Sequence, residues 1–225
     1  MSAEQPLAIA HRGGNTLAKL EAAFAANIDY SEIDLWFHRG RLEVRHEKAS
    51  WSLPVVWDRG VLKLRWRRGL TFEVLVAAMA GRGRLLVDLK GEAEGLAAAL
   101  AGSLKRAKAE ESVAFCGGWA HLDRLSELLP HVQRFYTIGT LERLAALRPR
   151  LERGEIAGVS INWRVLTEEI ASELKEKGVE SFVVWTVETR EAAERVMGWG
   201  ASGIISDSLP LLVAIQDGSI EVEGS

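Results

Sequence analysis

The sequence predicts a single-domain (β/α)8 barrel of the TIM type from its length, the alternation of its patterns and the character of its strands. Its 225 residues suit one domain and lie near the lower end of what such a barrel needs. Strand-like runs alternate with helical patterns almost from end to end, which is typical of a parallel sheet wrapped by helices. An open doubly wound sheet gives the same alternation. Eight units without a change of composition favour the closed barrel.

Eight short apolar runs carry the strand prediction. They are Leu7–Gly13, Ser31–Phe37, Leu85–Lys90, Val113–Cys116, Arg134–Ile138, Gly158–Asn162, Ser181–Val187 and Gly203–Asp207. Runs such as Ser181–Val187 are apolar on both faces, as strands buried on both sides should be. Helical spacing of apolar residues is found between these runs. It predicts helices over Thr16–Asn27, Thr71–Ala80, Leu122–Leu129, Leu141–Leu147, Glu168–Lys177 and Arg190–Met197.

A short insertion is predicted after the second strand. A turn at His38–Arg41 leads into a paired run, Leu42–His46, and the stretch Glu47–Leu70 follows. Within it, Trp51–Arg68 interleaves tryptophan with arginine and lysine. This predicts either a hairpin flap that packs on the barrel or a surface for phosphate head groups or a lipid interface. The domain is expected to span residues 1–216, with residues 217–225 as a flexible, polar and acidic C-terminal tail.

Composition excludes several classes of protein. Hydrophobic residues make up 48% of the chain, as in a folded domain with a sizeable core, and the net charge of −3 gives no overall attraction for nucleic acid. Cys116 is the only cysteine, so no intramolecular disulfide is expected. No cationic leader pattern opens the sequence, and no run approaches the roughly 20 apolar residues of a membrane span. We therefore expect a cytoplasmic protein without stable membrane insertion. The sequence gives no indication of its oligomeric state.

Polar side chains follow three successive strands where the barrel fold would bring them to one mouth. The working residues of such barrels lie at the carboxyl ends of the strands. The candidates there are His11, Arg12, Glu32, Asp34, His46, Asp88 and Lys90. Side chains two apart on a strand share a face, so Glu32 and Asp34 should point the same way, as should Asp88 and Lys90.

Their chemistry suits a phosphate ester. Three carboxylates without a cysteine ligand favour one hard divalent ion, Mg²⁺ or Ca²⁺. A metal together with arginine and lysine can hold a phosphate, and two imidazoles can act as general acid and base. Each signal alone has an ordinary structural explanation, such as a salt bridge between Asp88 and Lys90. Their coincidence on three strand ends points to phosphodiester cleavage.

Other signals have simpler interpretations. The glycine-rich run Gly198–Gly203 has the letters of a dinucleotide fingerprint, but it follows a predicted helix and precedes a strand, the reverse of the order required. Cys116 is expected in the core. His38, His121 and His131 are expected to be solvated or to cap helices.

Several of these runs resemble the glycerophosphodiester phosphodiesterase family. The similar segments, in order from residue 8 to about 210, are Ile9–Gly13, Glu32–Asp34, the strand end at His46, Leu86–Lys90, Val184–Val187 and Gly203–Asp207. The resemblance implies a (β/α)8 barrel and a divalent cation bound by Glu32, Asp34 and Asp88. It implies His11 and His46 as the acid–base pair, Arg12 and Lys90 as phosphate ligands, and Trp185 as an aromatic wall of the mouth. The implied partner is a small-molecule glycerophosphodiester, cleaved to glycerol 3-phosphate and an alcohol.

The sequence also departs from that family. The loop after His11-Arg12-Gly13 is shortened, Asp88 stands where a glutamate is usual, and Glu47 and Glu188 replace an aspartate and an asparagine. The compact first loop is also similar to sphingomyelinase D-like phospholipases, which release a cyclic phosphate. These departures leave two alternatives open: such a phospholipase, or a barrel that binds a phosphoester without cleaving it.

Overall fold

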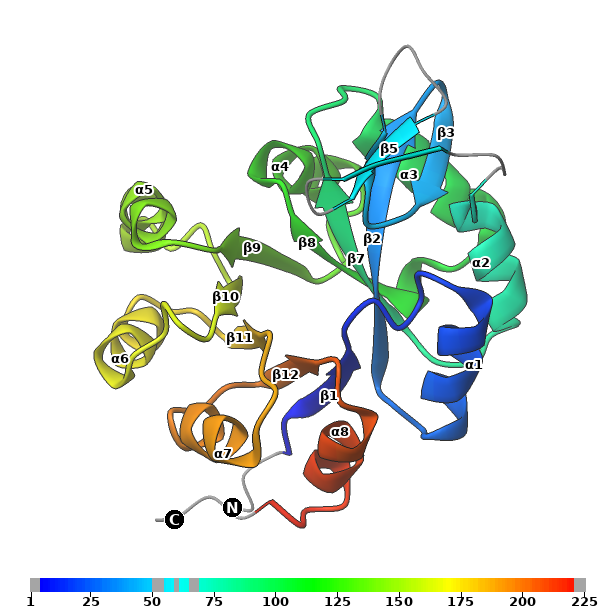
Figure 1. Ribbon diagram of the computed structural model, residues 1–225. Coiled ribbons are helices and arrows are strands. Elements are labelled where there is room, and N and C mark those ends of the chain that lie inside the picture. Colours follow the sequence, from blue (N-terminus) through cyan, green and yellow to red (C-terminus); the bar gives the residue numbers. More distant parts are fainter. Residues whose placement is uncertain (1–4, 50–54, 59–60, 65–68, 221–225) are drawn as a thin grey trace.

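The computed structural model describes residues 5–49, 55–58, 61–64 and 69–220, and in this part of the chain eight parallel strands form a closed barrel (Figure 1). The strands are β1 Leu7–Ala10, β2 Tyr30–His38, β7 Leu85–Lys90, β8 Val113–Gly117, β9 Arg134–Ile138, β10 Gly158–Asn162, β11 Ser181–Trp185 and β12 Gly203–Ser206. The ring closes because β1 pairs in parallel with both β12 and β2. The predicted closed barrel is therefore confirmed, and the open sheet is excluded.

Eight α-helices of the described residues surround the ring (Figure 1). They are α1 Leu17–Ala25, α2 Phe72–Met79, α3 Leu96–Ala107, α4 Trp119–Leu128, α5 Leu141–Glu152, α6 Glu168–Glu176, α7 Arg190–Gly198 and α8 Leu209–Gln216. A threonine or serine hydroxyl caps six of them by accepting the N–H three residues on, which satisfies a donor that the helix itself leaves unpaired. None of the described helices is long and apolar enough to cross a membrane.

Two of these helices were not predicted. Helix α3 is rich in alanine and glycine, small residues that do not distinguish a buried face from an exposed one. Its Leu96, Leu100 and Leu104 nevertheless form a buried stripe. Helix α8 is apolar almost all round, so its sequence carries no helical period. In α3 the leucines do recur at helical spacing, but the small residues between them obscure the pattern, whereas α8 is identified by its packing against the barrel.

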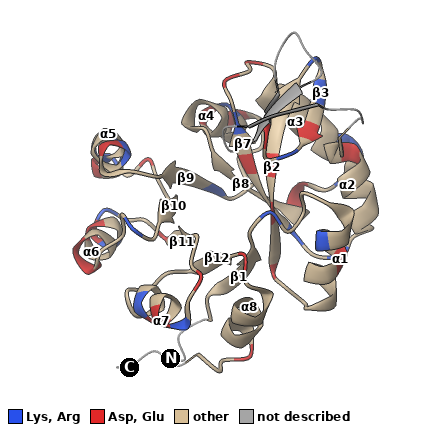
Figure 2. Cartoon of the chain, in the orientation of Figure 1, with Lys and Arg blue, Asp and Glu red and all other residues tan. Residues whose placement is uncertain are grey.

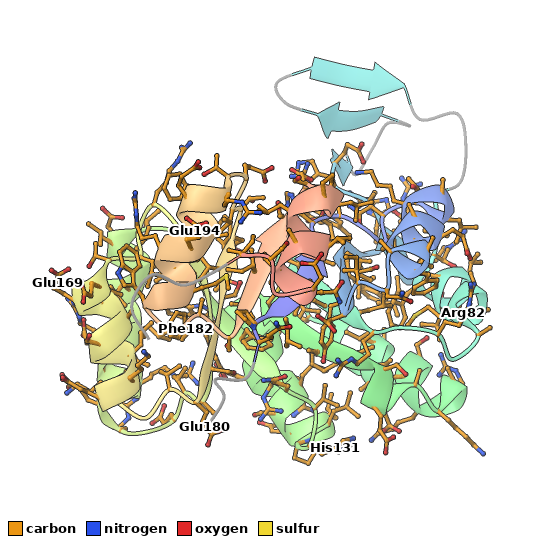
Figure 3. All side chains as sticks on the ribbon, turned by 90° about the horizontal axis from the view of Figure 1, so that it is seen from below. Arg82, His131, Glu169, Glu180, Phe182 and Glu194 are labelled. Atoms are coloured by element: carbon orange, nitrogen blue, oxygen red, sulfur yellow. The ribbon has the colours of Figure 1, made fainter. Side chains whose placement is uncertain are left out.

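The insertion after β2 forms additional antiparallel strands. Strand β3 Arg41–Val44 pairs with β2 outside the ring, and β4 Lys48–Ala49, β5 Val55–Asp58 and β6 Val61–Leu64 form a separate small sheet. This sheet stands off the barrel in Figure 3. His131 and Glu180, which precede β9 and β11, lie at the opposite end of the barrel, so the insertion occupies the end where the strands finish. The expected Trp/Arg surface of Trp51–Arg68 lies outside the residues whose side chains are described.

The barrel interior is filled from side to side. One cluster of buried side chains comes from seven of the strands: Ile9, Tyr30, Leu86, Ala114, Cys116, Phe135, Val183 and Ile205. A second and larger core lies between the strands and the helices. The chain stays packed past residue 216, since Ile220 is buried and the Ser219 carbonyl accepts a 2.7 Å hydrogen bond from Arg190. Apolar side chains thus occupy the interior of the barrel below its mouth.

Candidate active site

The loop after β1 turns sharply and brings His11 and Arg12 to the mouth. The His11 N–H donates to the Ser206 carbonyl at 2.8 Å, which fixes the end of β1 beside β12. Arg12 adopts a left-handed backbone conformation (φ 51°). The glycines behind it permit the close turn, because a Cβ on Gly14 would lie 2.4 Å from the Ile33 side chain. The shortened loop is therefore compact, and it places the Arg12 N–H 2.6 Å from Glu32 Oε2.

Three carboxylates converge below this loop. In the parallel pairing of β2 with β7, Asp34 lies opposite Asp88, and Glu32 stands two residues before Asp34 on the same face. Their ligand atoms all lie within 4.8 Å of one another. Figure 2 shows red, acidic segments on the neighbouring strands β2 and β7. An oxygen-only donor set of this kind fits Mg²⁺ or Ca²⁺ better than a softer metal.

Lys90 is the counter-ion of this group. Its Nζ lies 3.0 Å from Asp34 Oδ1 and also contacts Asp88 Oδ2. Burial opposes the charge on Lys90, but the two carboxylates outweigh it and raise the pKa of the ammonium. Burial likewise opposes ionisation of Asp34, yet Lys90 and Asn15 lower the pKa of Asp34 below its ordinary value. The predicted salt bridge between Asp88 and Lys90 is thus confirmed. Lys90 also forms an ion pair with Asp34 of β2, so it links β7 to β2.

The other two carboxyls hold their protons more tightly. Burial raises the pKa of Glu32 well above its ordinary value, and the charges of Asp34 and Asp88 add to the effect. Burial also raises the pKa of Asp88, against the opposing influence of Lys90. Two carboxyls whose pKa values are raised and one whose pKa is lowered therefore face a common centre. A divalent cation bound there would favour the ionised form of all three carboxyls. Buried carboxyls around a common centre are therefore what a cation site is expected to show.

The two imidazoles approach from different elements. His11 Nδ1 lies 3.1 Å from Asp207 Oδ1, just beyond β12, whereas His46 Nδ1 lies 3.4 Å from Asp34 Oδ2. Neither Nδ1 forms a hydrogen bond of good geometry with a described residue. Both side chains reach solvent, with exposed fractions of 20% for His11 and 39% for His46. Each ring therefore has its Nδ1 beside a carboxylate.

A pocket of about 500 Å³ joins most of these groups. Its lining includes His11, Arg12, Glu32, Asp34, Asp88, Lys90 and Trp185. The structure thus brings seven of the eight predicted site residues into one cavity. His46 is not part of the lining but adjoins it through Asp34.

Four further polar residues belong to this neighbourhood. Asn15 forms two hydrogen bonds with Asp34, and Asp207 adjoins His11. Thr137 and Arg143 line the far wall of the pocket. Asn15 and Asp207 follow predicted strand ends and could have been found by the same reasoning as His11. Arg143 lies in the first turn of a helix, where the sequence gives no signal of a functional role.

His121 requires a correction. It was expected to be solvated or to cap a helix, but it is buried, and its Nε2 lies 3.0 Å from the Gly91 carbonyl. This contact ties α4 to the residue that follows Lys90. His131 is exposed, as predicted.

Fold and site together define a (β/α)8 barrel with a carboxylate cluster, two imidazoles, an arginine and a lysine at the carboxyl ends of its strands. The sequence matches no protein-family model and no curated protein. Solved structures of glycerophosphodiester phosphodiesterases are similar to it. That from Parabacteroides distasonis has a TM-score of 0.72 at 17% identity over 97% of this chain and all of the other. That from Thermotoga maritima has a TM-score of 0.70 at 19% identity over 94% of this chain and 99% of the other.

A third similar structure contains a bound ligand. It is an Oleispira antarctica phosphodiesterase in complex with the product sn-glycerol-3-phosphate. Its TM-score is 0.76 at 21% identity, and the match covers 96% of this chain and 98% of the other. At these identities the likeness establishes a common fold. The family suggested by the sequence motifs and the family of these neighbours are the same.

Proposed function

We propose that this protein is a metal-dependent phosphodiesterase that hydrolyses glycerophosphodiesters to glycerol 3-phosphate and an alcohol. The observation that carries the proposal is the convergence of Glu32, Asp34 and Asp88 within 4.8 Å, with a histidine, an arginine and a lysine lining the same pocket. The naming of the structural neighbours, one of them with bound sn-glycerol-3-phosphate, supports the same substrate class.

The three carboxylates would hold one Mg²⁺ or Ca²⁺. Such an ion supplies a Lewis acid that neutralises charge on phosphate oxygens. Arg12 and Lys90 flank the carboxylates and would bind the remaining phosphate oxygens. Guanidinium and ammonium groups already in place there stabilise the negative charge that grows as the diester is cleaved.

His11 and His46 would move the protons. One imidazole takes the proton of the attacking hydroxyl while a new O–P bond forms, and the other gives a proton to the oxygen of the leaving alcohol as its P–O bond breaks. In the route implied by the family resemblance, the attacking hydroxyl belongs to the glycerol moiety, and water then opens the cyclic phosphate. Trp185, at the wall of the pocket, would cover the glycerol.

Phosphorus NMR of the reaction with glycerophosphocholine tests this proposal. A resonance of glycerol 3-phosphate, lost on treatment with EDTA and restored by Mg²⁺ or Ca²⁺, is the expected result. Accumulation of a cyclic phosphate would favour a sphingomyelinase D-like transfer. Binding without turnover would favour the non-catalytic barrel. We also propose a cytoplasmic location, which suits the single, unpaired and buried thiol of Cys116.

A further inference from the structure

Arg143 places a positive charge on one wall of the pocket. That wall is formed by β9 and α5, whereas the carboxylates come from β2 and β7. It lies in the first turn of α5, where its N–H donates to the Thr140 hydroxyl at 3.3 Å, and it belongs to the lining of the pocket. Among the described residues its guanidinium makes no ion pair. Two other arginines of the same helix are paired, Arg148 with Glu173 and Arg150 with Asp123. Arg143 is therefore an available anion-binding group.

An aromatic ring holds this guanidinium in place. The centre of the Arg143 guanidinium lies 3.9 Å from the centroid of the Trp119 ring. The Trp119 Nε1 donates to the Thr137 carbonyl at 3.0 Å, and the Thr137 hydroxyl accepts from the Gly117 N–H at 2.8 Å. The ring is thus fixed to the ends of β8 and β9. Stacking uses the face of a guanidinium and leaves its in-plane N–H donors available to a ligand.

The nearest carboxylate in the sequence is engaged elsewhere. Hydrogen bonds from the Thr140 hydroxyl and from its own backbone N–H lower the pKa of Glu142, which places that side chain at the start of α5. No side chain of residue 139 separates Arg143 from Trp185, because that residue is a glycine. A Cβ on Gly139 would lie 3.7 Å from Trp185 Cη2, so the indole edge approaches a position that has no side chain. Arg143 and Trp185 thus line one continuous pocket.

We propose that Arg143 binds a second anionic group of the substrate, carried by the alcohol beyond the reacting phosphate. This inference rests on the proposed phosphodiesterase function and specifies its substrate class. Diesters whose head group bears a phosphate or a carboxylate gain a charge-assisted hydrogen bond with Arg143. Diesters with a cationic choline-type head group meet a positive charge that no ion pair in the described residues compensates. The site therefore selects anionic head groups.

Two substrates that differ by one phosphate test the inference. Glycerophosphoinositol and glycerophosphoinositol 4-phosphate share the reacting diester, and the measured quantity is the ratio of their kcat/KM values. We expect the wild-type protein to favour the phosphorylated substrate by about tenfold or more, as a charge-assisted hydrogen bond implies. In Arg143→Gln the ratio should fall towards one. Arg143→Lys, which keeps the charge but loses the planar fork, should give an intermediate ratio.

Arg164 offers a matched control. It is exposed, lies 5.7 Å from the Trp163 centroid and does not line the pocket, so Arg164→Gln should keep the wild-type ratio. A wild-type ratio near one, or an unchanged ratio in folded Arg143→Gln, would overturn the subsite while hydrolysis itself persists. If the wild-type protein cleaves neither inositol substrate nor glycerophosphocholine, the phosphodiesterase function fails, and the subsite fails with it.

Discussion

Asn15 holds Asp34 by two hydrogen bonds. The Asn15 Nδ2 donates to Asp34 Oδ2 at 2.8 Å, and the Asp34 N–H donates to Asn15 Oδ1 at 2.9 Å. One amide side chain from the loop after β1 thereby fixes both the backbone and the carboxylate of a residue in β2. Hydrogen bonds from residues that do not bind the metal orient the side chains that do. Loss of such a hydrogen bond commonly lowers metal affinity by about 10–100-fold.

We therefore predict that Asn15→Ala weakens the binding of Mg²⁺ or Ca²⁺ by about tenfold or more, because Asp34 loses its fixed orientation. Isothermal titration calorimetry of the EDTA-treated protein with Mg²⁺ or Ca²⁺ measures this affinity. Asn162→Ala is the control, since Asn162 also ends a barrel strand, β10, but its side-chain oxygen accepts a hydrogen bond from the backbone N–H of Arg164 at 2.9 Å. Equal metal affinity in Asn15→Ala and in the wild-type protein would show that Asp34 does not depend on this amide.

The second prediction concerns the two imidazoles. His11→Ala and His46→Ala should each lower kcat by about 10²–10⁴-fold, which is the usual contribution of a general acid or base. His131→Ala, an exposed residue before β9, should leave kcat unchanged. Steady-state kinetics on glycerophosphocholine, with circular dichroism to verify folding, provides the test. A near-normal kcat in His46→Ala would remove that residue from the mechanism.

The third prediction uses the raised pKa of Glu32. In the metal-free protein its folded-state pKa exceeds the unfolded value because of burial, so the folded state loses stability as the pH rises above about 4.5. Glu32→Gln removes this penalty. We expect the metal-free variant to melt at a higher temperature than the wild-type protein at pH 7, with the difference vanishing near pH 4. Added Mg²⁺ or Ca²⁺ should stabilise the wild-type protein and not the variant.

Asp34 provides a control of opposite sign. Burial opposes its charge, but Lys90 and Asn15 lower its folded-state pKa, so its contribution to stability is present at neutral pH and is lost as the pH falls through that pKa. Asp34→Asn should therefore lower the melting temperature of the metal-free protein at pH 7. A lower melting temperature in Glu32→Gln as well would contradict the assigned directions. Differential scanning calorimetry over pH 4–8 measures both variants.

The fourth prediction concerns Gly117, at the end of β8. Its φ of 109° is unfavourable for other residues, and a Cβ there would lie 2.4 Å from Asp88 Oδ1. Gly117→Ala should destabilise the fold by about 1–3 kcal/mol and also displace Asp88, lowering metal affinity. Gly154→Ala is the control: its φ is 68° and nothing lies within 4 Å of its Cβ position. It should cost about 1–2 kcal/mol and leave metal affinity unchanged.

Local patterns in the sequence predicted the barrel and most of the residues that converge at its mouth. Alternating strands and helices are local patterns, and a run that is apolar on both faces, such as β11, records its burial in its own composition. The rule that functional groups lie at the carboxyl ends of barrel strands then selected Glu32, Asp34 and Asp88 before their proximity was known. Helix α8 was not predicted, because a segment that is apolar almost all round has no helical period.

Only the tertiary structure decided which groups meet. The register of β2 against β7 sets Asp34 opposite Asp88, and it also allows Lys90 to reach both carboxylates. Arg143 enters the site from α5, a segment far from those strands in the sequence, through the closure of the ring. Contacts of this kind depend on strand pairing and loop geometry over long separations, which no local spacing records. The pattern of residue types thus indicated the proposed chemistry, whereas closure of the barrel determined how the groups are arranged.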